Sequence, residues 1–339
     1  MPFPVLICDD FALARKQIVR SLPPQWDIDV THAVNGLEAI EAIRQGKGAL
    51  VFLDLNMPVM NGFEVLEKIQ SEKIVCQIIV VSADIQINAL MRVKALGALD
   101  FIQKPVNPES LKHILDEHNL FRVHRTHIPP LPDIFPLSLL DACKELANVA
   151  MGRAAALLST LLDVFVILPI PNVNTLEVSE LIMALKSTDE QESISALCQG
   201  FIGAGIAGEA LLLFHDSSFK DMAALMDLPS PPDQHAEVEI MIDIGNVLIG
   251  AFLNGLSEQL DMTFSQNHPV ILGRHCNAND LIQENSDKWT RSLAMEINYR
   301  IEHHDIQCDL LLVLTEDSLP TLTSKLAHFI DRNTASHDK

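Results

Sequence analysis

The chain has 339 residues, of which 48% are hydrophobic and 20% are charged, and its formal net charge at pH 7 is −21. This length allows two or three domains that each bury a core of their own. No uninterrupted apolar run reaches the ~18 residues needed to cross a bilayer, which argues against membrane insertion. The acidic residues Asp9 and Asp10 come too early for a signal peptide, so we expect a cytoplasmic protein.

The negative charge is concentrated in the later part of the chain. Residues 1–118 carry 11 Lys and Arg against 15 Asp and Glu, a net charge of −4, which leaves 13 against 30, a net charge of −17, for the rest. A region this acidic is repelled by the phosphate backbone that supplies most nucleic-acid affinity. We therefore expect no nucleic-acid partner, and we find no basic recognition helix of the kind a transcription factor needs.

The first 118 residues alternate short apolar runs with stretches of helical period. The apolar runs are Val5–Cys8, Leu50–Leu53, Ile78–Val81 and Leu99–Ile102, and the helical stretches are Ala12–Leu22, Gly36–Arg44, Gly62–Gln70, Gln86–Ala95 and Pro108–His118. Continuous apolar strands between helices indicate a parallel sheet that is covered on both faces. The sequence predicts an α/β doubly wound domain with five parallel strands.

Polar residues follow the predicted strands where each strand ends. They are Asp9 and Asp10, Asp54, Ser82 and Lys104. The carboxyl ends of parallel strands meet at one edge of the sheet, where the chemistry of such folds gathers. Three carboxylates at one edge repel one another unless a hard cation binds between them, and Mg²⁺ with its preference for oxygen ligands fits best. Lys104 and Ser82 add a positive charge and a hydroxyl donor that suit a phosphoryl group.

These residues belong to runs that resemble the motifs of CheY-type response-regulator receivers over about residues 3–120. The runs are Asp9-Asp10, Asp54-Leu-Asn-Met-Pro58, Asn61-Gly62, Ser82-Ala83 and Lys104-Pro105. The resemblance implies that Asp54 accepts a phosphoryl group from a sensor histidine kinase and that Ser82 and Lys104 contact that group. It also implies that Asp9, Asp10, Asp54 and the backbone carbonyl of Asn56 hold Mg²⁺. Phe101 falls where the family keeps an aromatic that turns inward on phosphorylation, with a plain core role as the alternative.

A proline-rich segment follows the receiver-like region. Pro129, Pro130, Pro132 and Pro136 forbid a regular element there. We therefore predict a receiver at 1–120, a linker at 121–136, an effector domain at 137–332 and a polar tail at 333–339.

The predicted effector contains an internal repeat. The pattern Asp141-x3-Glu145-x2-Asn148, followed after 22 residues by Pro171, recurs 98 residues later as Glu239-x3-Asp243-x2-Asn246, followed after 22 residues by Pro269. The run Leu211–Ser218 resembles Leu311–Ser318 at an offset of 100 residues. The offsets predict one pseudo-twofold α+β domain made of two halves, at about 137–228 and 235–332.

Each half is expected to contain the same elements. We predict a helix that carries the acidic and amide residues, a strand that ends at the proline, a second helix, two long strands and a closing helix. The alternation of Leu293, Met295, Ile297 and Tyr299 is typical of half-buried antiparallel strands. The predicted strand pairs are 193–201 with 206–214 and 292–301 with 306–314.

The spacing within the repeated pattern places Asp141, Glu145 and Asn148 on one face of a helix. The pattern resembles that of the CheC, CheX and FliY phosphatase family, over about residues 137–332. The resemblance implies a protein-aspartyl-phosphate phosphatase in which Asn148 orients a water and Glu145 pairs with a lysine of the substrate receiver. An amide that both donates and accepts suits the holding of a water in line with phosphorus.

The second repeat departs from the family pattern because Asp243 stands in place of Glu. Its carboxylate is one methylene shorter, so we expect Asp243 and Asn246 to be weak or inactive. The phosphatase would act on a phosphorylated CheY-like receiver, either its own or a separate one. The alternative is a noncatalytic adaptor of the flagellar-switch type whose phosphorylation changes its partners. The sequence leaves the oligomeric state open, a homodimer included.

Overall fold

The computed structural model describes residues 2–120, 138–177, 193–276 and 291–335. The chain divides into two compact units, residues 1–145 with 331–339 and residues 146–330. The predicted linker at 121–136, the segments 178–192 and 277–290 in which we expect the second helices, and tail residues 336–339 lie outside the described residues. The predicted domain boundaries therefore stay predictions.

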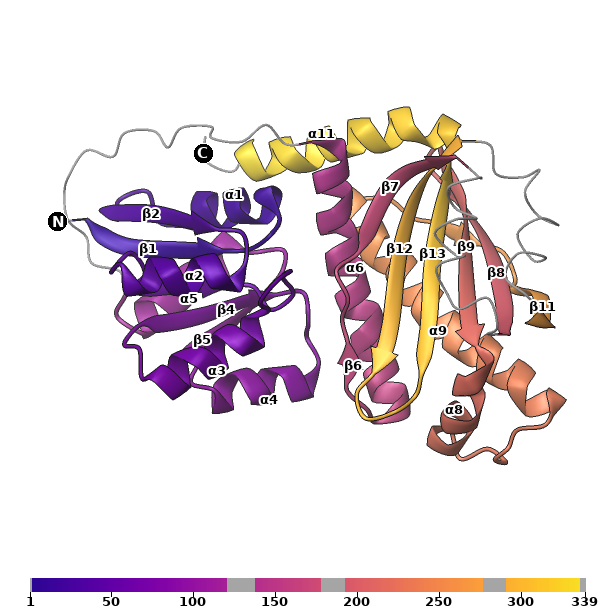
Figure 1. Ribbon diagram of the computed structural model, residues 1–339. Coiled ribbons are helices and arrows are strands. Elements are labelled where there is room, and N and C mark those ends of the chain that lie inside the picture. Colours follow the sequence, from indigo (N-terminus) through magenta and orange to yellow (C-terminus); the bar gives the residue numbers. More distant parts are fainter. Residues whose placement is uncertain (1, 121–137, 178–192, 277–290, 336–339) are drawn as a thin grey trace. The chain divides into compact units, whose positions relative to one another are not determined.

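The first unit contains a five-stranded sheet in the order β2-β1-β3-β4-β5 (Figure 1). All neighbouring strands are parallel, as predicted. The strands are β1 (Phe3–Cys8), β2 (Ile28–Ala33), β3 (Leu50–Leu53), β4 (Gln77–Ser82) and β5 (Asp100–Gln103), and the helices are α1 (Ala12–Ser21), α2 (Gly36–Arg44), α3 (Gly62–Glu72), α4 (Ile87–Ala95) and α5 (Pro108–Glu117). Strand β2 lies at the edge of the sheet and is mostly half-buried, which explains why it lacks the continuous apolar run of the inner strands.

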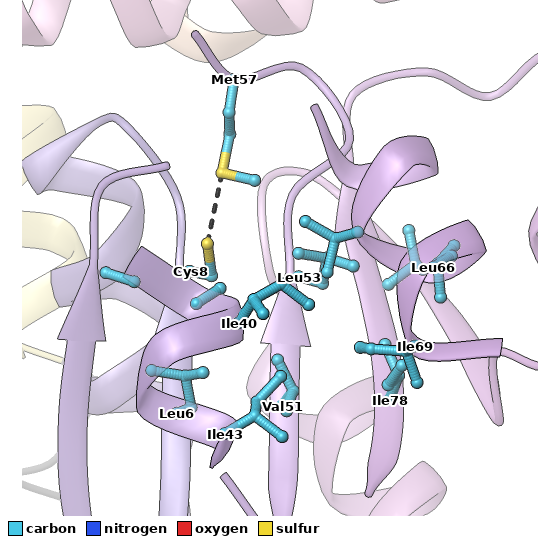
Figure 2. Packing of buried hydrophobic residues seen from close by; sticks show 14 of the residues in the cluster. Leu6, Cys8, Ile40, Ile43, Val51, Leu53, Met57, Leu66, Ile69 and Ile78 are labelled. Atoms are coloured by element: carbon cyan, nitrogen blue, oxygen red, sulfur yellow. Dashed lines mark hydrogen bonds between the residues drawn. The ribbon is translucent and has the colours of Figure 1, made fainter. Parts of the chain in front are cut away.

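Both faces of this sheet are buried in separate apolar clusters. One contains Leu6, Val51 and Val80 with residues of α2 and α3, and the other contains Ile7, Phe52 and Val81 with residues of α1 and α5. Figure 2 shows the first cluster, in which the sulfur atoms of Cys8 and Met57 approach within 3.4 Å. The buried thiol of Cys8 fills space beneath the acidic edge of the sheet, and burial raises its pKa well above the ordinary value.

The second unit is built on an antiparallel sheet, as predicted. Its strands follow the order β10-β8-β9-β13-β12-β6, with β11 also paired to β8 and β7 also paired to β12. The strands are β6 (Val166–Ile167), β7 (Asn172–Glu177), β8 (Ile194–Gly203), β9 (Ile206–His215), β10 (Ser265–Gln266), β11 (Val270–Cys276), β12 (Arg291–Ile301) and β13 (Gln307–Thr315). The helices are α6 (Leu139–Leu162), α8 (Phe219–Leu225), α9 (Gln234–Leu260) and α11 (Leu319–Ala335), with short 3-10 turns η1 (Asp216–Ser218) and η3 (Glu316–Ser318).

The described elements recur in the same order in the two halves. The order α6, β6, β7, β8, β9, η1, α8 is repeated as α9, β10, β11, β12, β13, η3, α11. At the centre of the sheet Leu211 pairs with Leu311, its own equivalent at the 100-residue offset. A residue that pairs with its own equivalent marks a twofold axis, so the axis passes between these two leucines.

Two buried serines repeat this symmetry in their hydrogen bonds. The hydroxyl of Ser218 accepts from the backbone N–H of Gln307 at 3.0 Å and donates to the same residue's carbonyl at 3.4 Å. The hydroxyl of Ser318 accepts from the N–H of Ala207 at 2.9 Å and donates to its carbonyl at 3.0 Å. Each half thus holds the start of the other half's inner strand, and we call these the reciprocal serine contacts.

The expected position of the prolines is wrong. We predicted a strand that ends at Pro171 and at Pro269, but β7 begins at Asn172 and β11 begins at Val270, directly after each proline. Only the two-residue strands β6 and β10 precede them. Proline has no N–H to give to a ladder, so it lies at the break between a short strand and a longer one.

Among the described residues one helix, α9, is long and apolar enough to cross a membrane by length and composition. In its most apolar window 61% of the residues are buried inside the protein.

Candidate functional site

The acidic residues predicted for the first unit do meet at one edge of its sheet. Asp9 and Asp10 follow β1, Asp54 follows β3, and one carboxylate oxygen from each lies within 4.8 Å of the others. Oδ1 of Asp10 is buried without a hydrogen-bond partner among the described residues. Oδ2 of Asp54 is likewise buried without a hydrogen-bond partner among the described residues. A set of oxygens this close, with two of them lacking such a partner, fits a small hard cation such as Mg²⁺.

Lys104 provides the positive charge at this cluster. Its Nζ lies 2.7 Å from Oδ2 of Asp9 and 3.4 Å from Oδ1 of Asp54. Burial acts to lower the pKa of Lys104, but the carboxylates of Asp54 and Asp9 outweigh it and raise this pKa well above its ordinary value. The lysine therefore stays charged at the place where a phosphoryl oxygen would need a partner.

Two of the three carboxyl groups, those of Asp10 and Asp54, have a raised pKa. Burial, followed by the charges of Asp9 and Asp54, raises the pKa of Asp10 to about 8. Burial also raises the pKa of Asp54 to about 7, against the lowering effect of Lys104. A bound divalent cation reverses this balance because it stabilises the charged carboxylates.

The loop that holds Asp54 depends on a glycine. A Cβ added to Gly62 would lie 2.3 Å from the carbonyl oxygen of Asp54, so only glycine lets the start of α3 come this close. Asn61 caps α3 by accepting from the N–H of Glu64, whose side chain in turn accepts from the N–H of Asn61. The Asn61-Gly62 motif thus fixes the backbone beside the phosphoacceptor candidate.

The other predicted receiver residues lie on neighbouring strands and loops. Ser82 ends β4, is buried, and accepts from the N–H of Asp84 at 3.2 Å. Asn56 stands two residues after Asp54 in the same loop. Phe101 is half-buried on β5, where it packs against the first apolar cluster.

One buried residue near this cluster escaped the sequence analysis. Nη1 of Arg15, on α1, donates to the backbone carbonyls of Asp9 at 2.6 Å and of Asp10 at 3.1 Å. It therefore fixes the backbone that carries two of the three carboxylates. The only sequence signal is an arginine on an otherwise apolar helix face, which by itself is common.

On α6, Asp141, Glu145 and Asn148 occupy one line along the helix, and we call them the first stripe. Asp141 has a structural role in addition. Its N–H donates to the hydroxyl of Ser138 at 3.0 Å, and that hydroxyl donates to the carboxylate of Asp141 at 2.8 Å. Ser138 and Asp141 therefore cap the start of the helix.

The second stripe is formed by Glu239, Asp243 and Asn246 on α9, and all three residues are exposed. Its helix begins differently, because Asp233 caps α9 by accepting from the N–H groups of His235 and Ala236. Glu239 therefore stands inside the helix, whereas its counterpart Asp141 lies in the first turn of α6.

A glycine follows each stripe at the same distance. Gly152 and Gly250 are also 98 residues apart, which extends the repeated pattern by one more turn. A Cβ added to Gly250 would have no atom within 4 Å, so its own unit leaves this surface open. The offset alone could have revealed these two glycines.

Comparison with known families supports the identity of the first unit. Residues 5–116 match the model of the response regulator receiver domain. Together with the five-stranded parallel sheet, this match establishes that the N-terminal part of the chain is a receiver domain.

Curated relatives match over a similar length. A protein-glutamate methylesterase/protein-glutamine glutaminase of Clostridium acetobutylicum is 37% identical over 116 residues, which is 33% of this chain and 34% of the relative. An uncharacterised response regulatory protein of Staphylococcus epidermidis is 34% identical over 132 residues, 37% of this chain and 51% of the relative. The chain thus spans about a third to a half of the length of these relatives.

Solved structures resemble parts of the chain. The response regulator domain of Thermotoga maritima CheB is 31% identical with a TM-score of 0.31, covering 35% of this chain and 98% of that one. Thermotoga maritima FliY is 15% identical with a TM-score of 0.42, covering 58% of this chain and 99% of that one.

Proposed function

We propose that the chain is a two-component signalling protein that both accepts and hydrolyses an aspartyl phosphate. In the receiver, Asp54 takes the phosphoryl group from a sensor histidine kinase. Asp9, Asp10, Asp54 and the backbone carbonyl of Asn56 hold Mg²⁺, which supplies charge neutralisation for the phosphoryl oxygens when it is bound. The close carboxylates and the unpaired oxygen of Asp10 support this assignment.

Two further receiver residues act on the phosphoryl group in this proposal. Lys104, now 3.4 Å from Asp54, pairs with a phosphoryl oxygen once Asp54 is modified. Ser82 offers its hydroxyl as a donor to a second oxygen. Phe101 responds to the change on the neighbouring strand, which is how the phosphorylated state is communicated to a partner.

The second unit, with the start of α6, is proposed to be the phosphatase. The main support for this proposal is the stripe of acidic and amide residues. It occurs with the same spacing on two helices, α6 and α9, of a domain whose sheet has twofold symmetry. Such a stripe taken once is an ordinary solvated helix face, but its recurrence with Pro171 and Pro269 in register is not. Two polar residues held on a rigid helix can position a substrate better than residues on a loop.

The proposed chemistry needs no nucleophile from the effector. The side chain of Asn148 accepts from and donates to a water, and so holds it in line with the phosphorus of the substrate receiver. Glu145 pairs with the active-site lysine of that receiver and fixes its orientation. The water oxygen bonds to phosphorus while the bond from phosphorus to the aspartyl oxygen breaks, which yields inorganic phosphate and the free aspartate. The rate acceleration comes from the proximity and orientation of the water relative to the phosphorus.

The direct test is phosphate release from a separate phosphorylated CheY-like receiver on addition of the full-length protein. We expect faster release with the wild-type chain, and a rate close to that of the receiver alone with Glu145→Ala or Asn148→Ala. Asn254→Ala serves as a matched control because it removes an exposed asparagine elsewhere on α9.

Absence of any acceleration by the wild-type chain would reject the phosphatase and favour the noncatalytic adaptor. The control distinguishes a loss of catalysis from a loss of folding, since a loss of activity with Asn254→Ala as well would indicate a general effect on folding.

A further inference from the structure

Helices α6 and α9 approach each other very closely at one point. A Cβ added to Gly255 would lie 2.8 Å from Cα and 3.0 Å from Cβ of Ala150, so glycine is required there. One helical turn further along α6, the guanidinium of Arg153 forms an ion pair with Glu258. The last turns of α9 therefore pack on the part of α6 that directly follows the first stripe.

A buried glutamine adds a directional contact to this packing. Gln259 is 9% exposed, and its Nε2 donates to the backbone carbonyl of Leu146 at 3.1 Å and to that of Gly255 at 3.1 Å. A primary amide has two hydrogens, so both are used. The carbonyl of Leu146 belongs to the same helical turn as Glu145 and Asn148.

Such a contact controls how α6 is rotated about its own axis. The close approach at Gly255 sets the distance between the helices, and the hydrogen bond to Leu146 sets which side of α6 faces α9. Side chains extend about 5–6 Å from a helix axis, so a rotation of roughly 10° moves their ends by about 1 Å. An error of that size in a positioned group can lower a rate by about 100-fold.

Among the described residues, the second stripe has no equivalent contact. At the 98-residue offset, Gly255 corresponds to Leu157 and Gln259 corresponds to Leu161. Both leucines are on α6 and are 54% and 46% exposed. Neither can donate a hydrogen bond to the turn of α9 that carries Asp243 and Asn246.

We infer that Gln259 is a positioning residue for Glu145 and Asn148, and that the second stripe lacks this support. This inference rests on the proposed phosphatase function. The two stripes then differ in two independent ways. One difference is Glu145 against Asp243 on the stripes themselves, and the other is the support that Gln259 gives to the backbone beneath the first stripe alone.

The test replaces Gln259 in the full-length protein by methionine, which keeps the size and removes both donors. We expect kcat for phosphate release from a separate phosphorylated receiver to fall about tenfold with KM changed less than about twofold. Because Gln259 acts through Glu145 and Asn148, Gln259→Met should cause a smaller loss in a chain that already carries Asn148→Ala than in the wild-type chain. Gln199→Met is the matched control, since Gln199 is also buried and its Nε2 donates to the carbonyl of Asn267 at 2.8 Å.

Hydrogen exchange supplies a readout that needs no enzymatic activity. In Gln259→Met the amides of residues 146–150 should exchange faster, while those of residues 244–248 should not change. Unchanged exchange at 146–150 would overturn the inference whatever the activity, and so would a wild-type kcat, an additive loss with Asn148→Ala, or an equal loss in Gln199→Met. A wild-type chain that releases no phosphate would instead reject the proposed function.

Discussion

The two halves of the second unit share a scaffold and differ in their stripes. The strand order is symmetric about the Leu211–Leu311 pair, and the reciprocal serine contacts join the same hydroxyl and backbone groups in both halves. The residues on and beneath the two stripes differ. Asp243 stands at the position equivalent to Glu145, and Leu161 stands at the position equivalent to Gln259. A contact near the twofold axis stabilises both halves, so a change there affects the whole domain. A stripe affects only the partner that binds to it, so the two stripes can differ without loss of the fold.

The largest expected effect separates the two stripes directly. Asn148→Ala should lower the rate of phosphate release from a separate receiver by about 100-fold, because the water is no longer held in line. Asn246→Ala should change it by less than about twofold. The measurement is the initial rate of phosphate release at saturating receiver, and equal losses in the two variants would show that the halves are functionally alike.

The scaffold should respond in the opposite way, with equal effects in the two halves. Ser218→Ala removes the hydroxyl partner of the half-buried N–H and carbonyl of Gln307. Ser318→Ala removes the hydroxyl partner of the half-buried N–H of Ala207, whose carbonyl keeps Thr315 as a donor. Each loss should lower the free energy of unfolding by about 1–3 kcal/mol. We expect the two losses, measured by urea unfolding, to agree within about 1 kcal/mol.

Ser217→Ala is the control for this pair because Ser217 is exposed in the same turn, and it should change stability by less than about 0.5 kcal/mol. A large loss in only one of the two buried serines would mean that the scaffold is less symmetric than its hydrogen bonds indicate.

The smallest expected effect concerns a histidine of the second half that contacts an acidic residue from each half. His275, which is half-exposed, places Nδ1 2.8 Å from Asp216 and Nε2 3.1 Å from Glu237, and Arg274 also contacts Glu237 at 3.3 Å. The hydrogen bond to Asp216 is the main cause that raises the pKa of His275 above its ordinary value of 6.5. The first half has Glu177 and Leu139 at the positions of His275 and Glu237.

Because the folded state raises this pKa, the stabilisation is fully present below about pH 6.5 and is lost as pH rises through the raised value. Thermal unfolding should therefore show His275→Ala less stable than the wild type at pH 5.5 and almost equal to it at pH 9. His304→Ala, which removes an exposed histidine, should show no such pH dependence. A difference that grows with pH would contradict this account.

The receiver fold was predictable because its inner strands are buried on both faces and so appear as continuous apolar runs. Strand β2 was counted but not located, since an edge strand has no such run. The effector repeat was found by its fixed offset, and the same offset would have revealed Gly152 and Gly250. The roles of Arg15, Ser218 and Gln259 were not predictable, because each depends on a partner that only the fold brings near.

The prolines show a different limit of the sequence. The sequence predicts a strand that ends at Pro171 and at Pro269, and this is wrong because a residue that breaks a ladder can stand at either end of a strand. Which end it takes depends on the neighbouring strand that supplies the hydrogen-bond partners. That neighbour is β12 for β7 and β8 for β11, and each lies far away in the sequence.

The reciprocal serine contacts have a consequence for how such a duplicated domain is inherited. Each half completes the backbone hydrogen bonds of the other, so a gene that lost one half would encode a sheet with open positions at its centre. A mutation that silences one stripe removes none of these contacts and leaves folding intact. An inactive stripe can therefore be retained during evolution, because the other half needs the half that carries it in order to fold.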